Sequence, residues 1–69
     1  MSADSPIVAY GTAQVAEWLG VGQSVVSNWI RRHPANVPQP DVVLIAPSGW
    51  ETWGWFAERR EEWETWYAA

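Results

Sequence analysis

The 69-residue sequence predicts a mainly α fold with one small β-hairpin, arranged as helix, turn, helix, hairpin and C-terminal helix. Three observations lead to this prediction. Apolar residues recur at helical spacing on both sides of Gly20, a β-branched run is separated from an aromatic run by Pro-Ser-Gly, and the C-terminal end mixes aromatic and charged residues at helical intervals. A chain this short buries only about 60% of the surface that its unfolded form exposes. We therefore expect one domain over residues 1–69, with residues 1–6 disordered.

The N-terminal half is predicted to form two helices joined by a tight turn. Residues 7–10 are expected to pack on the core as a brief strand or arm. A first helix over residues 12–19 ends at Gly20, because glycine adopts positive φ without steric cost. A second helix over residues 23–33 ends before Pro34 and carries one apolar stripe. The stripe consists of Val26, Trp29 and Ile30.

The C-terminal half is predicted to form a hairpin and a last helix. Residues 34–40 contain three prolines, which is typical of a rigid connector. The β-branched run at residues 42–45 and the aromatic run at residues 50–53 are expected to form two strands, joined by turn-forming residues at 46–49. Residues 55–68 are expected to form a helix in which four aromatic side chains share a face. These are Phe56, Trp63, Trp66 and Tyr67.

Charge is distributed unevenly along the chain. The net charge is −4, with four arginines and no lysine, whereas proteins that bind nucleic acids usually carry a basic excess. The arginines occur only as two pairs, Arg31-Arg32 and Arg59-Arg60. Six of the eight acidic residues lie from Asp41 onward, and residues 10–40 contain Glu17 as their only acid. We therefore expect the second arginine pair to bond to neighbouring glutamates at i, i+3 or i, i+4, and the first pair to lie on an acid-poor surface.

The composition disfavours several classes of function. The chain has no cysteine and one histidine, so disulfides and thiolate metal sites are excluded, and we expect no metal and no cofactor. No apolar run approaches the roughly 20 residues that cross a bilayer, and the N-terminus lacks a signal peptide, so we expect a cytoplasmic protein without a membrane partner. The glutamates at residues 58–64 have no nucleophile or glycine-rich phosphate loop beside them. We therefore expect neither enzyme activity nor a small-molecule substrate.

Residues 12–32, TAQVAEWLGVGQSVVSNWIRR, resemble the helix-turn-helix of small phage excisionases and of MerR-type regulators, in which a short hairpin wing follows. The most specific part of the resemblance is the spacing from the small Ala16 through Gly20 to the apolar stripe. Ala16 lets two helices cross closely, and Gly20 makes the sharp turn between them. Gly22 departs from the pattern, because a serine or threonine usually caps the second helix. The cap therefore falls to Gly22 itself or weakly to Ser24.

The resemblance implies a winged helix-turn-helix whose second helix enters the major groove of double-stranded DNA. Gln23 and Asn28 have the two-pronged amide chemistry that suits adenine, and Arg31 suits guanine or phosphate. In the wing, Ser48 and Gly49 are small enough to approach a minor groove, although no arginine or lysine lies at the tip. The candidate DNA-contacting residues are Gln23, Ser24, Ser27, Asn28, Arg31 and Arg32. A solvated helix face is the simpler explanation of the uncharged side chains among them.

The sequence supports two hypotheses of function. The first is a sequence-specific DNA-binding protein of the phage excisionase or transcriptional regulator type, which acts as a dimer or cooperative assembly. The second is a winged-helix protein-interaction module, an antirepressor or modulator, that uses an acidic, tryptophan-rich C-terminal surface. The seven tryptophans exceed what so small an interior hides, so this surface is also expected to mediate self-association or contact with a second protein. The candidate interface residues are Trp50, Trp53, Trp66 and Tyr67.

Overall fold

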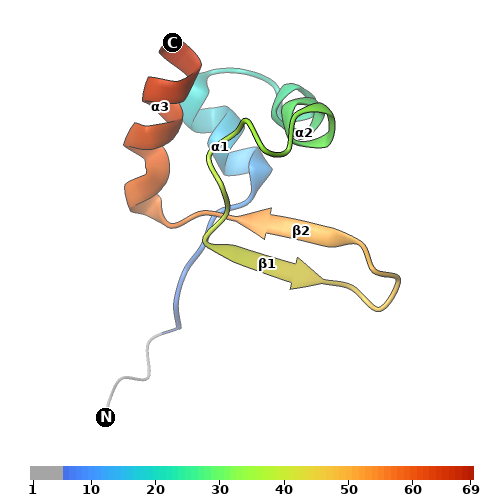
Figure 1. Cartoon of the computed structure of the whole chain (residues 1–69). Helices are drawn as coiled ribbons and strands as arrows, with labels where there is room; N and C mark the ends of the chain where they lie inside the picture. Colours follow the sequence, from blue (N-terminus) through green and yellow to red (C-terminus); the bar gives the residue numbers. More distant parts are fainter. Residues whose placement is uncertain (1–5) are drawn as a thin grey trace.

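The computed structural model describes residues 6–69, which form three α-helices and a two-stranded antiparallel hairpin between the second and third of them (Figure 1). The elements are α1 (Thr12–Leu19), α2 (Gln23–Arg32), β1 (Val42–Ile45), β2 (Glu51–Gly54), a 3-10 helix η1 (Ala57–Arg59) and α3 (Arg60–Ala68). The predicted mainly α class with one small hairpin is confirmed. The prediction of disorder for residues 1–6 falls, apart from Pro6, outside the described residues.

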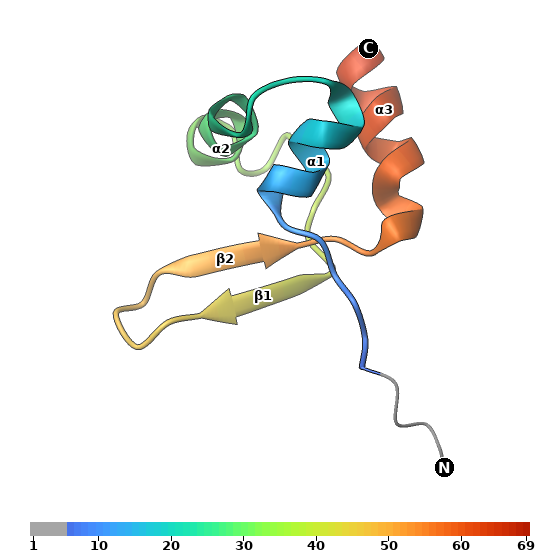
Figure 2. The ribbon, with the colours of Figure 1, turned by 180° about the vertical axis from the view of Figure 1, so that it is seen from behind.

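The helices lie together on one side of the hairpin, and the hairpin turn extends beyond them (Figures 1 and 2). Both α2 and α3 pack against α1, so α1 is the central helix of the group. Within the described part of the chain, no helix is long and apolar enough to cross a membrane.

The turn between α1 and α2 has the geometry that its glycine predicts. Gly20 adopts the left-handed conformation with φ 71°, and the N–H of Val21 donates to the carbonyl of Ala16 at 3.0 Å, which closes the last turn of α1. Gly22 is the extended N-cap of α2 and makes no side-chain bond, which is the first of the two predicted alternatives. α2 ends at Arg32, one residue earlier than predicted, because a residue that precedes proline leaves helical geometry.

The core lies where the three helices and the connector of residues 34–40 meet. Among the described residues, the buried apolar side chains are Val15, Ala16, Val26, Val37, Trp55 and Trp63. Ala16 is buried and adds little bulk to α1, which packs against α2 and α3. Val26 is buried, with Trp29 and Ile30 partly buried beside it. The predicted apolar stripe of α2 is therefore confirmed.

The chain after β2 corrects the prediction of a helix that begins at Trp55. Trp55 forms an antiparallel bridge with Tyr10 instead, with backbone N···O distances of 2.7 and 2.8 Å. Its indole is fully buried, donates to the Pro38 carbonyl at 3.0 Å and meets Trp63 edge to face at 5.2 Å. Burial of a large ring with its N–H satisfied outweighs helix propensity here. Phe56 is extended as well, so helical structure starts only at η1.

The hairpin also differs from the prediction by a small shift. β1 and β2 pair with Ile45 opposite Glu51, so the second strand begins one residue later than expected. Trp50 belongs to the turn instead, because its carbonyl accepts the N–H of Ala46 at 2.8 Å. Gly49 completes this turn at φ 90°, a conformation that favours glycine.

The N-terminal segment packs less than predicted. Tyr10 is held by its bridge to the end of β2 and by an edge contact with Trp18, with ring centroids 5.8 Å apart. Ile7 and Val8 are 81% and 59% exposed, so they do not join the core. In this segment the bridge involves the backbone of Tyr10 alone, and residues 6–9 remain on the surface.

The proline connector is tied to α3 and to itself by hydrogen bonds. Val37 and Pro38 are buried, and Nε1 of Trp66 donates to the Asn36 carbonyl at 2.7 Å. The side-chain amide of Gln39 donates to the Val37 carbonyl at 2.9 Å. The first of these bonds holds the connector against α3, and the second stabilises the connector's own conformation.

Candidate nucleic-acid interface

The exposed face of α2 contributes three of the predicted residues to a groove. Gln23, Ser27 and Arg31 follow one another at i, i+4 and i+8 along the helix. They form one wall of a groove of about 480 Å³ between α2 and the hairpin. Gln23 Nε2 donates to Thr12 Oγ1 at 3.2 Å, which orients its amide. The opposite wall consists of Trp50, Glu51, Thr52 and Trp53, and Thr12 and Ile30 complete the lining.

The other three predicted residues lie on the neighbouring side of α2, outside this groove. Ser24, Asn28 and Arg32 also recur at i, i+4 and i+8. Ser24 and Arg32 are exposed, whereas Asn28 is half-buried. The Oδ1 atom of Asn28 accepts a hydrogen bond from Arg31 Nη2 at 3.4 Å, which links the two rows. α2 therefore presents two parallel rows of polar side chains, one inside the groove and one beside it.

The arginines at the start of α3 are engaged in ion pairs. Arg59 contacts Glu62 at 2.8 Å and Arg60 contacts Glu64 at 3.1 Å, so the predicted i, i+3 and i, i+4 pairing is confirmed. A further pair joins Arg59 to Asp41 at 2.6 Å, and only the fold brings these two residues together. The hydrogen bond to Glu62, helped by the one to Asp41 and opposed by desolvation, raises the pKa of the Arg59 guanidinium above its ordinary value.

The arginines of α2 have different surroundings. Among residues 6–69, no carboxylate lies within ion-pairing distance of Arg31 or Arg32, and both residues are exposed. Because the chain has four arginines and no lysine, the arginines left unpaired in the described residues both belong to α2. Their place in the last turn of α2 also suits the negative end of the helix dipole. A local positive region therefore exists on a protein whose net charge is −4.

The hairpin wall of the groove has two aromatic and two polar side chains, one of them an acid, and Trp50 is the only exposed apolar side chain of the hairpin that lines it. The exposed apolar side chains of the hairpin are Val43, Leu44, Ile45 and Trp50. Glu51 is the only charged residue among residues 42–54, and its Oε1 accepts a hydrogen bond from Trp53 Nε1 at 3.3 Å. Sequence reasoning missed Glu51 as a member of the site. No pattern along the chain signals it, since only the fold places the hairpin across the groove from α2.

The two small residues predicted for the wing lie at the hairpin turn. Gly49 makes the turn, and Ser48 Oγ accepts the N–H of Trp50 at 3.4 Å. Ser48 and Gly49 therefore shape the turn. The bulky exposed side chains at this end of the hairpin are those of Ile45 and Trp50.

The four aromatic residues predicted for a protein interface fall into two groups. Trp50 and Trp53 line the groove beside α2. Trp66 and Tyr67 pack on Trp29, with ring centroids 5.0 and 5.6 Å from it, near the end of α3. Figures 1 and 2 place that end of α3 away from the hairpin turn. The two groups therefore belong to different parts of the surface.

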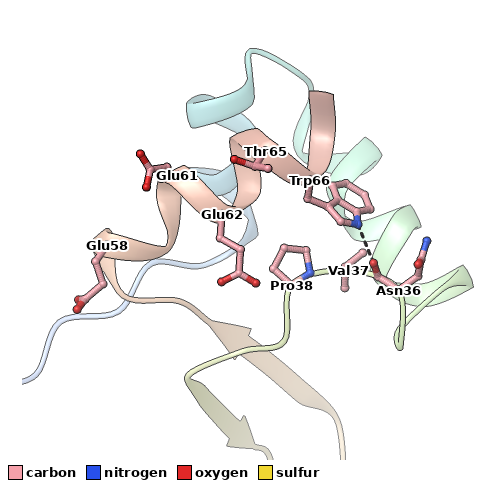
Figure 3. A pocket seen from close by; sticks show the side chains of 8 residues that line it. All are labelled: Asn36, Val37, Pro38, Glu58, Glu61, Glu62, Thr65 and Trp66. Atoms are coloured by element: carbon pink, nitrogen blue, oxygen red, sulfur yellow. Dashed lines mark hydrogen bonds between the residues drawn. The ribbon is translucent and has the colours of Figure 1, made fainter. Parts of the chain in front are cut away.

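A second hollow, of about 510 Å³, lies between α3 and the connector (Figure 3). Its lining consists of Asn36, Val37, Pro38, Glu58, Glu61, Glu62, Thr65 and Trp66. The indole of Trp66 reaches across it to the Asn36 carbonyl, with Glu62 directed toward the connector and Glu61 away from it (Figure 3). Glu62 is paired with Arg59, so the carboxylates that line this hollow without an ion pair among residues 6–69 are those of Glu58 and Glu61.

Comparisons with known proteins do not identify a family. No family model, no curated protein and no solved structure matches the chain. The function is therefore inferred from the residues and their geometry. Among residues 6–69, no three side chains of the types that ligate metals come together in an arrangement that could hold an ion.

Proposed function

We propose that the chain is a small winged helix-turn-helix protein that binds double-stranded DNA in a sequence-specific manner, with α2 in the major groove. The observation that carries this proposal is the placement of charge. Among residues 6–69, the arginines without a carboxylate partner are Arg31 and Arg32, both on α2. Phosphate attraction is the main sequence-independent term in DNA binding, and it requires cations that the protein has not already neutralised. The element order is compatible with this class of protein.

The two rows of α2 supply different contacts under this proposal. Gln23 in the groove and Asn28 beside it carry amides that pair with the edge of adenine. Arg31 suits guanine or a phosphate, and Arg32 at the end of the helix suits a backbone phosphate. The two serines bond to either a base or a phosphate. Base contacts then determine the sequence, and phosphate contacts determine the orientation of the protein on the duplex.

One copy of the chain offers few contacts to the DNA backbone. Two free arginines correspond to about two neutralised phosphates, and thus to a salt slope of about −2 per copy. Such weak binding requires more than one copy on the DNA. We therefore propose that the protein acts as a dimer or cooperative assembly, in the role of an excisionase or a transcriptional regulator.

The proposal is tested by comparing one arginine from each pair. Arg31→Ala is expected to lower the affinity for a random pool of duplex DNA about tenfold at low salt, because a good base or phosphate contact contributes about 1–3 kcal/mol. Arg60→Ala is the matched control, since it removes the same charge from α3, and it is expected to change the affinity by less than about twofold. Fluorescence anisotropy measures both variants, with circular dichroism as the test of folding. Equal affinities of Arg31→Ala and wild type would remove the proposed role of α2.

The hollow along α3 favours a second candidate function, a protein-interaction module of the antirepressor or modulator kind. Its indole and its free carboxylates suit a basic segment of a partner protein (Figure 3). We expect a lysine- and arginine-rich peptide to bind the wild type, and the double variant with Glu58→Gln and Glu61→Gln to bind it more weakly. Tryptophan fluorescence follows the titration. Failure of the wild type to bind such a peptide at low salt would rule out this candidate.

A further inference from the structure

Trp50 differs from the other tryptophans of the chain. Each of the other six packs against a second aromatic ring, at centroid distances from 5.0 to 6.2 Å. Within residues 6–69, Trp50 has no ring contact of this kind, and it is 72% exposed. An exposed indole forgoes the burial by which tryptophan stabilises a fold. The stability of the protein therefore does not explain the position of Trp50.

The hairpin turn holds Trp50 at the groove beside α2. Its backbone N–H donates to Ser48 Oγ at 3.4 Å, and its carbonyl accepts the Ala46 N–H at 2.8 Å. Its side chain lines the same groove as Ser27 and Arg31. One wall of this groove therefore offers hydrogen-bond donors and the unpaired guanidinium of Arg31. The other wall offers the Trp50 and Trp53 rings, together with Thr52 and the Glu51 carboxylate.

A DNA strand complements a groove with these two walls, because charged phosphates alternate with apolar deoxyribose along it. The hairpin, residues 42–54, has no arginine or lysine, so it has no cation to place on a phosphate. Apolar side chains do contact DNA in proteins that use the minor groove.

We propose that Trp50 packs its indole against the deoxyribose edge of the DNA strand whose phosphates α2 binds. The hairpin then contacts DNA through an apolar surface instead of a basic tip. This inference rests on the proposed DNA-binding function and assigns a contact to the hairpin. Neither an indole nor a sugar releases counterions, so the contribution of Trp50 to affinity is independent of salt.

Anisotropy titrations at several salt concentrations separate this contact from an ionic one. Trp50→Ala is expected to weaken DNA binding about tenfold at every salt concentration, without changing the slope of log affinity against log salt. Arg31→Ala is expected to reduce that slope by about one. Trp50→Phe keeps a ring and should retain most of the affinity. Ile7→Ala is the control, since Ile7 is 81% exposed and lies outside the groove.

Three results would overturn the inference. The first is an affinity of Trp50→Ala equal to that of the wild type. The second is a loss of affinity that accompanies dissociation of a dimer, seen by sedimentation without DNA, because a second copy would then cover Trp50. The third is an absence of DNA binding by the wild type even at about 20 mM salt, where phosphate attraction is strongest. Only this last result also removes the proposed function, so the two failures are distinguishable.

Discussion

Arg31 and Arg32 end α2, whereas Arg59 and Arg60 lie at the start of α3, and the two pairs have the same composition but different neighbours. α2 contains no acidic residue, so nothing on that helix neutralises the first pair. The second pair lies among glutamates, and the fold adds Asp41. The net charge of −4 therefore does not describe the surface that a partner meets. The position of the unpaired arginines determines which surface attracts an anionic partner.

Removal of the most tightly paired guanidinium is expected to have the largest effect on stability. Arg59→Ala eliminates hydrogen bonds to Asp41, Glu62 and the Gln39 carbonyl, at 2.6, 2.8 and 2.9 Å. We expect the free energy of unfolding to fall by about 2 kcal/mol, because bonds to charged groups contribute about 1.5–3 kcal/mol. Arg31→Ala should change it by less than about 0.5 kcal/mol, since the side chain is exposed. Urea unfolding measures both variants, and equal destabilisation would contradict the distinction between the two pairs.

The stabilisation that the Arg59 ion pairs supply depends on pH with a defined sign. The partners of Arg59 raise its pKa, so the stabilisation is fully present below the ordinary pKa of arginine and is lost only as the pH rises through the raised value. We therefore expect the difference in unfolding free energy between wild type and Arg59→Ala to stay constant from about pH 6 to pH 9. A difference that shrinks within this range would show that Arg59 does not remain charged and paired.

A smaller effect is expected when the acid of the groove is neutralised. Glu51→Gln removes a carboxylate that lines the same groove as Arg31 and would oppose a phosphate. We expect the affinity for duplex DNA to rise about threefold at low salt, because the variant removes a solvent-screened repulsion between the carboxylate and a phosphate. Glu17→Gln, an exposed change on α1 outside the groove, is the control for net charge. Equal effects of the two variants would mean that DNA does not approach the groove.

The smallest effect is expected for the exposed pair on α3. The ion pair of Arg60 with Glu64, at 3.1 Å, joins two side chains that are about half exposed, and solvent screens it. Arg60→Ala should therefore lower the free energy of unfolding by less than about 0.5 kcal/mol. The same urea titration detects this change. A loss as large as that of Arg59→Ala would show that charge on α3, rather than the contact with Asp41, stabilises the fold.

Elements that depend on residues a few positions apart could be predicted from the sequence. The left-handed Gly20 and the apolar spacing of α2 belong to this class. Trp55 could not be placed in this way, because its bridge to Tyr10 and its hydrogen bond to Pro38 join distant parts of the chain. The pattern of residues 55–68 predicts a helix that includes Trp55, and tertiary burial overrides this local preference.

The candidate site was predictable to a similar extent. The polar rows of α2 follow from helical spacing, and both rows are present on the helix. The hairpin wall of the groove, with Trp50 and Glu51, depends on the direction in which the connector sends the chain. Long-range contacts such as the bond from Trp66 to the Asn36 carbonyl hold the connector, and no local pattern reveals them.

Titration of the wild-type protein with random duplex DNA, followed by anisotropy, tests DNA binding most directly. The series begins at about 20 mM salt, where phosphate attraction is strongest, and continues at rising salt and protein concentration. We expect cooperative binding that weakens with salt, with a slope of about −2 per copy. An absence of binding at the lowest salt would contradict the proposed function and would leave the acidic hollow along α3 as the surface to study.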